Sequence, residues 1–106
     1  DIAGMWSGYG WGTVKLEPKE AGYEGTYSST YGKAVGRIQV QWSPQTRRWE
    51  GDWSEGTYRF GQVSFWVESD LTIRGVYSAD PTCEREPGDP EHQEFHWLKG
   101  GTQFGL

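Results

Sequence analysis

The chain has 106 residues and a formal net charge of −5, which fits one small domain. An acidic chain lacks the basic stripe that nucleic-acid binding requires, and no apolar run approaches membrane-spanning length, so we expect neither nucleic-acid binding nor membrane insertion. Sixteen glycines disfavour a helical protein, because each costs about 1 kcal/mol inside a helix. Seven tryptophans, six tyrosines and four phenylalanines supply large apolar areas for a compact core.

A six-residue pattern, apolar-x-Gly-x-aromatic-Ser, occurs four times, at residues 2–7, 23–28, 49–54 and 73–78. Its glycines, Gly4, Gly25, Gly51 and Gly75, lie 21, 26 and 24 residues apart. That spacing matches a β-hairpin with its loops, so the repeat predicts architecture. In each copy the apolar, Gly and aromatic positions share one strand face, which we expect to point inward.

Four further segments between and after the copies alternate apolar and polar residues, at 13–17, 37–42, 62–67 and 94–97. Eight short strands joined mostly by turn-forming residues predict an all-β fold, an eight-stranded antiparallel up-and-down β-barrel built from four hairpins. The mid-strand glycines favour closure, because they let strands bend and make room for neighbouring rings. A two-sheet sandwich with glycines at bulges remains the alternative.

We assign residues 1–99 to a single barrel domain and residues 100–106 to a C-terminal tail or linker. The segment 78–91 is the one long predicted loop, rich in proline and charge. It holds Cys83, the only cysteine of the chain. A single cysteine leaves the redox compartment open; of the possible locations we favour an extracytoplasmic one, periplasmic or secreted.

The segment Gly25-Thr26-Tyr27-Ser28-Ser29 resembles the Gly-Thr-Tyr-x-Ser segment of the avidin/streptavidin family, and Gly4-Met5-Trp6 is similar to the Gly-x-Trp of its first strand. The resemblance implies an eight-stranded up-and-down barrel. In that family the positions matching Tyr27 and Ser29 contact biotin. The chain has Gly8 where the family has asparagine, so the resemblance implies the fold and not biotin binding. The glycine-aromatic layout also resembles small all-β modules appended to larger bacterial proteins.

The strands that carry the repeat all end at one rim of such a barrel. Ligand sites in barrels favour the mouth, and the loops at this rim are rich in glycine and aromatic residues. A separate candidate is Trp66, which its strand register places outside among polar neighbours, as in sugar-stacking platforms and protein interfaces. A bulge could instead turn it inward. The candidate ligand-binding residues are Tyr9, Trp11, Tyr27, Ser29, Tyr31 and Trp66.

Nine rings are expected inside the barrel, where they either fill the interior or line a cavity. An eight-stranded barrel is just wide enough for side chains or one small ligand. So many rings favour a filled core. These rings are Trp6, Tyr23, Tyr27, Trp42, Trp49, Trp53, Phe65, Tyr77 and Trp97.

Catalysis and metal binding find little support in the sequence. His92 and His96 share a strand face, but they are about 13 Å apart along an extended strand, too far to ligate one ion. Cys83 beside either histidine is weak evidence for a nucleophile–base pair. We therefore predict no catalytic residue, no metal and no cofactor.

These features predict a noncatalytic binding or interaction module, excised from a larger bacterial protein, that uses exposed aromatics or rim loops. Its partner would be a carbohydrate or a protein. The alternatives are an internal pocket for a small apolar molecule, as in lipocalins and avidins, and then a peptidase inhibitor that presents its N-terminal segment.

Overall fold

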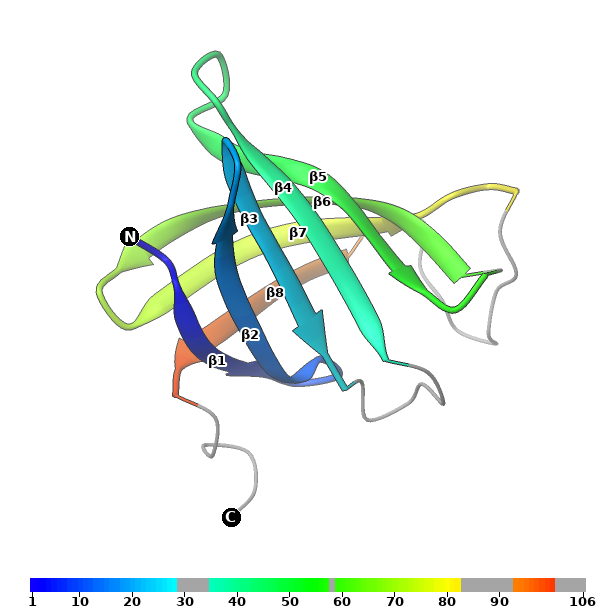
Figure 1. Cartoon of the computed structure of the whole chain (residues 1–106), viewed down its shortest axis with the longest axis horizontal. Coiled ribbons are helices and arrows are strands. Elements are labelled where there is room, and N and C mark those ends of the chain that lie inside the picture. The colour runs from blue at the N-terminus through cyan, green and yellow to red at the C-terminus, as the bar shows by residue number, and fades with distance from the viewer. Residues whose placement is uncertain (29–34, 58, 83–92, 101–106) are drawn as a thin grey trace.

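The computed structural model describes residues 1–28, 35–57, 59–82 and 93–100. Eight antiparallel strands, paired in chain order, close into a barrel (Figure 1). This confirms the all-β barrel of four hairpins and excludes the two-sheet sandwich. No described element is a helix long and apolar enough to cross a bilayer. The strands are β1 (Gly4–Gly8), β2 (Gly12–Lys19), β3 (Gly22–Tyr27), β4 (Gly36–Ser43), β5 (Arg48–Glu55), β6 (Arg59–Ser69), β7 (Thr72–Ala79) and β8 (Gln93–Lys99).

Period-two alternation decides which side chains lie inside. In β4 the buried Ile38 and Val40 alternate with the exposed Arg37 and Gln39. The same alternation in the other strands turns one face of each into a common core. The most fully buried large side chains are Val14, Leu16, Ile38, Phe65, Ile73 and Trp97.

Three mid-strand glycines, Gly25, Gly51 and Gly75, lie where neighbouring strands approach closely, as closure requires. Only Gly75 packs under an aromatic ring. A Cβ on Gly75 would lie 2.6 Å from the ring of Phe95. One on Gly25 would meet an aliphatic methyl of Leu16, at 2.8 Å. At Gly51 the obstacle is the backbone of β4, above all the carbonyl of Gln39. A neighbouring ring was expected over all three glycines. This expectation is wrong at Gly25 and Gly51, which contact aliphatic and backbone atoms instead.

The barrel closes where β1 meets the C-terminal end of β8. Only two residue pairs join these strands, Trp6 with Lys99 and Ser7 with Leu98. The amide of Gly100 donates to the carbonyl of Met5 at 2.8 Å. The ammonium of Lys99 donates to the carbonyl of Ala3 at 3.2 Å and lies 4.7 Å from the Trp6 ring centroid. We call this region the seam.

The two ends of the barrel differ in what they carry. Strands β1, β3, β5 and β7 finish at one end, which we call the serine rim because each repeat serine lies near the end of its strand. The β2–β3, β4–β5 and β6–β7 turns lie at the opposite end, where the β4–β5 hairpin projects in Figure 1. The topology thus confirms that the repeat strands end together.

Candidate functional site

At the serine rim the structure leaves little exposed aromatic surface among the described candidates. Tyr9 is 73% exposed in the β1–β2 turn. Ser29 and Tyr31 lie outside the described residues, as do Cys83 and His92 of the sequence analysis.

Trp11, expected at the mouth of the barrel, is buried in the core and only 6% exposed. The turn that carries it is tightened by a hydrogen bond of 3.0 Å from the Trp11 amide to the Gly8 carbonyl. Positive φ angles at Gly10 and Gly12, 81° and 69°, permit this reversal. The indole therefore folds over the interior and closes it. Its ring centroid lies 4.8 to 5.5 Å from those of Tyr27, Tyr77, Phe95 and Trp97.

Tyr27 is also buried, and its hydroxyl is fixed by neighbours. It donates to Glu55 Oε2 at 2.7 Å, and Arg59 Nε donates to Glu55 Oε1 at 3.4 Å. The Glu55 side chain is 11% exposed. Burial raises the pKa of the Tyr27 hydroxyl well above its ordinary value, and the hydrogen bond and charge of Glu55 raise it further. The arrangement holds β3, β5 and β6 together at the rim.

Side chains occupy the barrel interior along the described strands. Beyond Trp11, the centroids of Phe65 and Trp97 are 5.2 Å apart and those of Phe95 and Trp97 are 5.0 Å apart. Trp53 Nε1 donates to the Ser78 carbonyl at 2.9 Å. Trp97 Nε1 is buried without a hydrogen-bond partner in the described structure. Packing of this kind favours a filled core over an internal ligand cavity.

Trp66 lies on the outer surface of β6, as its register predicts. It is paired across the sheet with Arg74 and is partly exposed. The guanidinium carbon of Arg48 lies 4.4 Å from its ring centroid, a cation–π contact. Arg48 therefore covers part of the ring.

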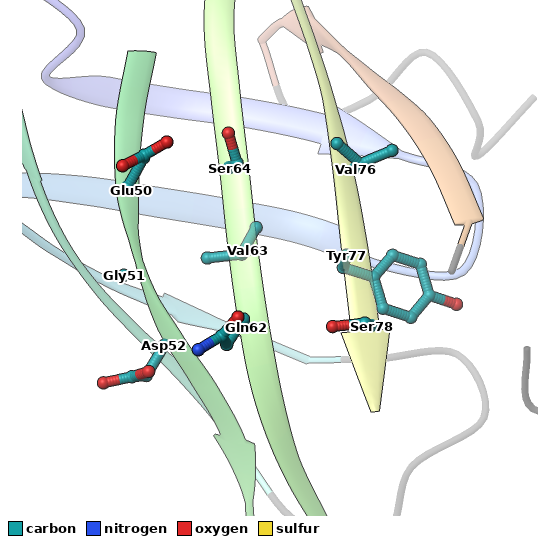
Figure 2. Close-up of a pocket in the computed structure, with 9 residues that line it drawn as sticks. All are labelled: Glu50, Gly51, Asp52, Gln62, Val63, Ser64, Val76, Tyr77 and Ser78. Atoms are coloured by element: carbon teal, nitrogen blue, oxygen red, sulfur yellow. The ribbon is translucent and has the colours of Figure 1, made fainter. Parts of the chain in front are cut away.

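Next to Trp66, a groove of about 430 Å³ crosses the outer surface of β5, β6 and β7 (Figure 2). Two rows of cross-strand neighbours supply its outward side chains. One row is Glu50, Ser64 and Val76, and the other is Asp52, Gln62 and Ser78. The remaining lining residues are Gly51, Val63 and Tyr77, which form its floor from the inward positions.

The groove is polar and carries two negative charges. Glu50 Oε2 accepts a hydrogen bond from Thr46 Oγ1 at 3.0 Å. Neither Glu50 nor Asp52 forms an ion pair with any described cation, whereas Glu17, Glu24, Glu55 and Glu68 all do. The Ser64 hydroxyl is buried and has no hydrogen-bond partner among the residues of the described ranges. With almost no accessible surface, this oxygen lies beneath the surface of the groove.

A second surface, at the end opposite the serine rim, consists of rings expected in the core. Trp42 is 47% exposed, and Tyr23 and Trp49 are partly buried. The centroids of Trp42 and Trp49 are 5.3 Å apart, and those of Tyr23 and Trp49 are 5.0 Å apart. Trp42 and Trp49 form the second-last residue pair of the β4–β5 hairpin. Trp42 is exposed, and Trp49 only partly buried, because this hairpin extends past the packed interior.

The described residues contain no group of three or more His, Cys, Asp or Glu side chains arranged to hold a metal ion.

The groove was missed by sequence reasoning because its rows are built from three strands in register. Alternation predicted that Glu50, Asp52, Gln62, Ser64 and Trp66 face outward, but it did not predict which of them lie side by side. No protein-family model, curated protein or solved structure matches the chain.

Proposed function

We propose that the protein is a noncatalytic binding module and that its ligand is a carbohydrate held in the groove over β5, β6 and β7. The observation that carries the proposal is the groove itself, about 430 Å³ in volume and lined by carboxylate, amide and hydroxyl groups. Its volume lies within the roughly 300–1,000 Å³ of small-ligand sites, but it is more open and more polar than most of them, which suits a polar ligand. Sugar hydroxyls both donate and accept hydrogen bonds, which suits this mixture.

Trp66 supports the carbohydrate interpretation because it lies two residues beyond Ser64 on the same face of β6. A sugar longer than the groove would reach its indole, which Arg48 contacts at 4.4 Å. The floor strands argue against an extended peptide. Each of β5, β6 and β7 pairs with a neighbour on both sides, so backbone groups there are not free to add a strand.

Intrinsic tryptophan fluorescence titrated against a glycan panel tests the proposal. We expect a saturable change, lost or weakened in Gln62→Ala by about 2–10-fold, as removal of one neutral hydrogen bond implies. Trp66→Ala should weaken binding while it changes the free energy of unfolding by less than about 1 kcal/mol. Thr26→Ala, on the exposed face of β3, is the matched control. Absence of any response across the panel contradicts the carbohydrate proposal, and release of shorter sugars contradicts its noncatalytic part.

A protein partner is the second candidate, favoured by the ring cluster Tyr23, Trp42 and Trp49. Exposed tryptophans are enriched where proteins bind one another. Trp42→Ala would then abolish capture of a partner without changing any response to sugars. The two candidates are separated by which tryptophan substitution removes binding, Trp66 or Trp42.

A further inference from the structure

We propose that the β1–β2 turn is a lid, and that the volume filled by its Trp11 indole is a binding slot for a planar aromatic molecule that carries a hydrogen-bond acceptor. The turn consists of Tyr9, Gly10 and Trp11, between the paired Gly8 and Gly12. The inference goes beyond the carbohydrate function, because this slot lies inside the barrel and the groove lies on its outer surface. The filled interior is then the closed state of the protein.

Trp11 differs from the other buried rings in the element that holds it. Among the buried rings of the described residues, Trp11 alone lies outside a strand. A strand paired on both sides cannot release its ring without breaking the sheet, whereas a turn can. Gly10 and Gly12 have positive φ angles of 81° and 69° in the closed turn. Since glycine also adopts other backbone conformations without steric cost, these two residues are suitable hinges.

The walls of the slot determine the shape and polarity of the ligand. The rings of Tyr27, Tyr77 and Trp97 meet the Trp11 indole at interplanar angles of 61°, 83° and 79°, and Phe95 meets it at 47°. None of these four side chains carries a charge, and the Tyr27 hydroxyl is already hydrogen-bonded. A flat, neutral ring system of about the size of an indole would therefore recover the ring contacts that Trp11 loses when it swings outward.

The indole N–H of Trp97 indicates that this molecule carries an acceptor. Trp97 is fully buried, and its Nε1 has no hydrogen-bond partner in the part of the chain that the structure describes. A buried donor without a partner is unfavourable and rare. A Cβ on Gly8 would lie 2.5 Å from Cδ1 and 3.3 Å from Nε1 of Trp97, so the N–H edge of this ring lies against the base of the turn. The closed turn covers this edge, and movement of the turn uncovers it.

The experiment compares quinoline with naphthalene at neutral pH, where quinoline is uncharged. The two molecules have the same shape, but only quinoline has a ring nitrogen that accepts a hydrogen bond. Each is titrated into the unsubstituted protein while nuclear magnetic resonance follows the indole N–H signals. We expect saturable binding of both, about 2–10-fold tighter for quinoline, and a downfield shift of the Trp97 signal with quinoline alone. The Trp6 N–H, which donates to the Ile2 carbonyl, is the internal control.

Two substitutions separate the lid from the donor. Trp11→Ala vacates the slot and should tighten binding of both probes, because the ligand no longer has to displace the indole. Trp97→Phe keeps a ring but removes the N–H, and should abolish the preference for quinoline. Leu71→Ala removes an exposed apolar side chain from the β6–β7 turn and should leave both affinities unchanged.

The titration of the unsubstituted protein is decisive even if Trp11→Ala fails to fold. If neither probe binds to it up to the limit of solubility, the turn is not a lid, even where Trp11→Ala binds both. Equal affinities without a shift of the Trp97 signal overturn the acceptor-bearing class of ligand. A preference for quinoline that survives Trp97→Phe places the ligand elsewhere. None of these results depends on the glycan panel, so this inference and the carbohydrate function fail separately.

Discussion

The atoms that an added Cβ would meet decide how much each glycine of the repeat contributes to stability. At Gly25 an added Cβ meets the end of a flexible Leu16 side chain, whereas at Gly51 it meets the backbone of β4. A side chain can rotate away, but a strand paired on both sides cannot move without losing hydrogen bonds. The same repeat position therefore tolerates substitution very differently in two strands.

We predict that Gly51→Ala destabilises the protein more than Gly25→Ala does. Overpacking typically costs about 1–3 kcal/mol, and we expect Gly25→Ala to lie within that range and Gly51→Ala to exceed it. Chemical denaturation of both variants measures the difference. Equal midpoints would show that β4 moves freely away from Gly51, against the close contact with the Gln39 carbonyl.

The Tyr27 hydroxyl predicts how stability falls at alkaline pH. Its pKa is raised in the folded state, so above pH ~10 the unfolded chain loses this proton while the folded protein keeps it. The folded state then binds more protons, and the free energy of unfolding falls as pH rises, by up to about 1.4 kcal/mol per pH unit. Below pH ~10 the contribution is fully present.

Tyr27→Phe should therefore give a shallower loss of stability above pH ~10 than the parent protein shows. The comparison is between slopes, because the substitution also removes a hydrogen bond to Glu55 at every pH. Tyr9→Phe removes an exposed hydroxyl and is the control. Parallel slopes for all three proteins would mean that the Tyr27 proton is as easily lost in the folded state as in the unfolded chain.

Among the elements, β1 is the shortest strand, and its contact with β8 is the weakest part of the closed sheet. Two residue pairs join β1 to β8, whereas eight join β4 to β5. Stability against local opening follows the number of protected hydrogen bonds and buried contacts. The seam should therefore open before the β4–β5 hairpin does.

We predict that Lys99→Ala accelerates amide hydrogen exchange in β1 more than in β4. The substitution removes a hydrogen bond to Ala3 and a cation–π contact with Trp6, together worth about 1–2 kcal/mol. Lys15→Ala, which removes an exposed lysine from the middle of β2, serves as the comparison. Uniform acceleration over all strands in Lys99→Ala would show that the seam does not open on its own.

Sequence alone predicted the elements well and the site poorly. Alternation around residues such as Ile38 and Val40 identified the strands, because a half-buried strand must alternate. Alternation says nothing of how far a packed interior extends, so Trp42 was expected inside. It also says nothing of a turn that folds inward, as at Trp11. The row of Glu50, Ser64 and Val76 depends on the register of three strands, which no local pattern contains.

At the scale of the whole molecule, core and closure depend on each other. The buried rings contact partners from strands far apart in the chain, such as Trp11 with Phe95 and Phe65 with Trp97. A partly opened barrel would lose many of these contacts at once. The ring network should therefore disappear cooperatively with the sheet.

We predict that near-ultraviolet circular dichroism, which reports ring packing, and far-ultraviolet circular dichroism, which reports strands, give the same denaturation midpoint. Coincident transitions are the mark of two-state unfolding in a small domain. Loss of the near-ultraviolet signal at lower denaturant would reveal a state in which strands persist after the rings have separated.

At the seam the first strand of the chain pairs with the last, so the two ends of the folded chain lie near each other. Gly100 is hydrogen-bonded to Met5, so a short peptide joining the first residues to those after β8 would complete the ring of strands without altering any pairing. A circular permutant cut in the exposed β4–β5 turn, at residues 44–46, would then keep the groove on three uninterrupted strands. In such a permutant the last strand of the chain is β4 in place of β8, so the order in which strands are synthesised changes while the folded product stays the same.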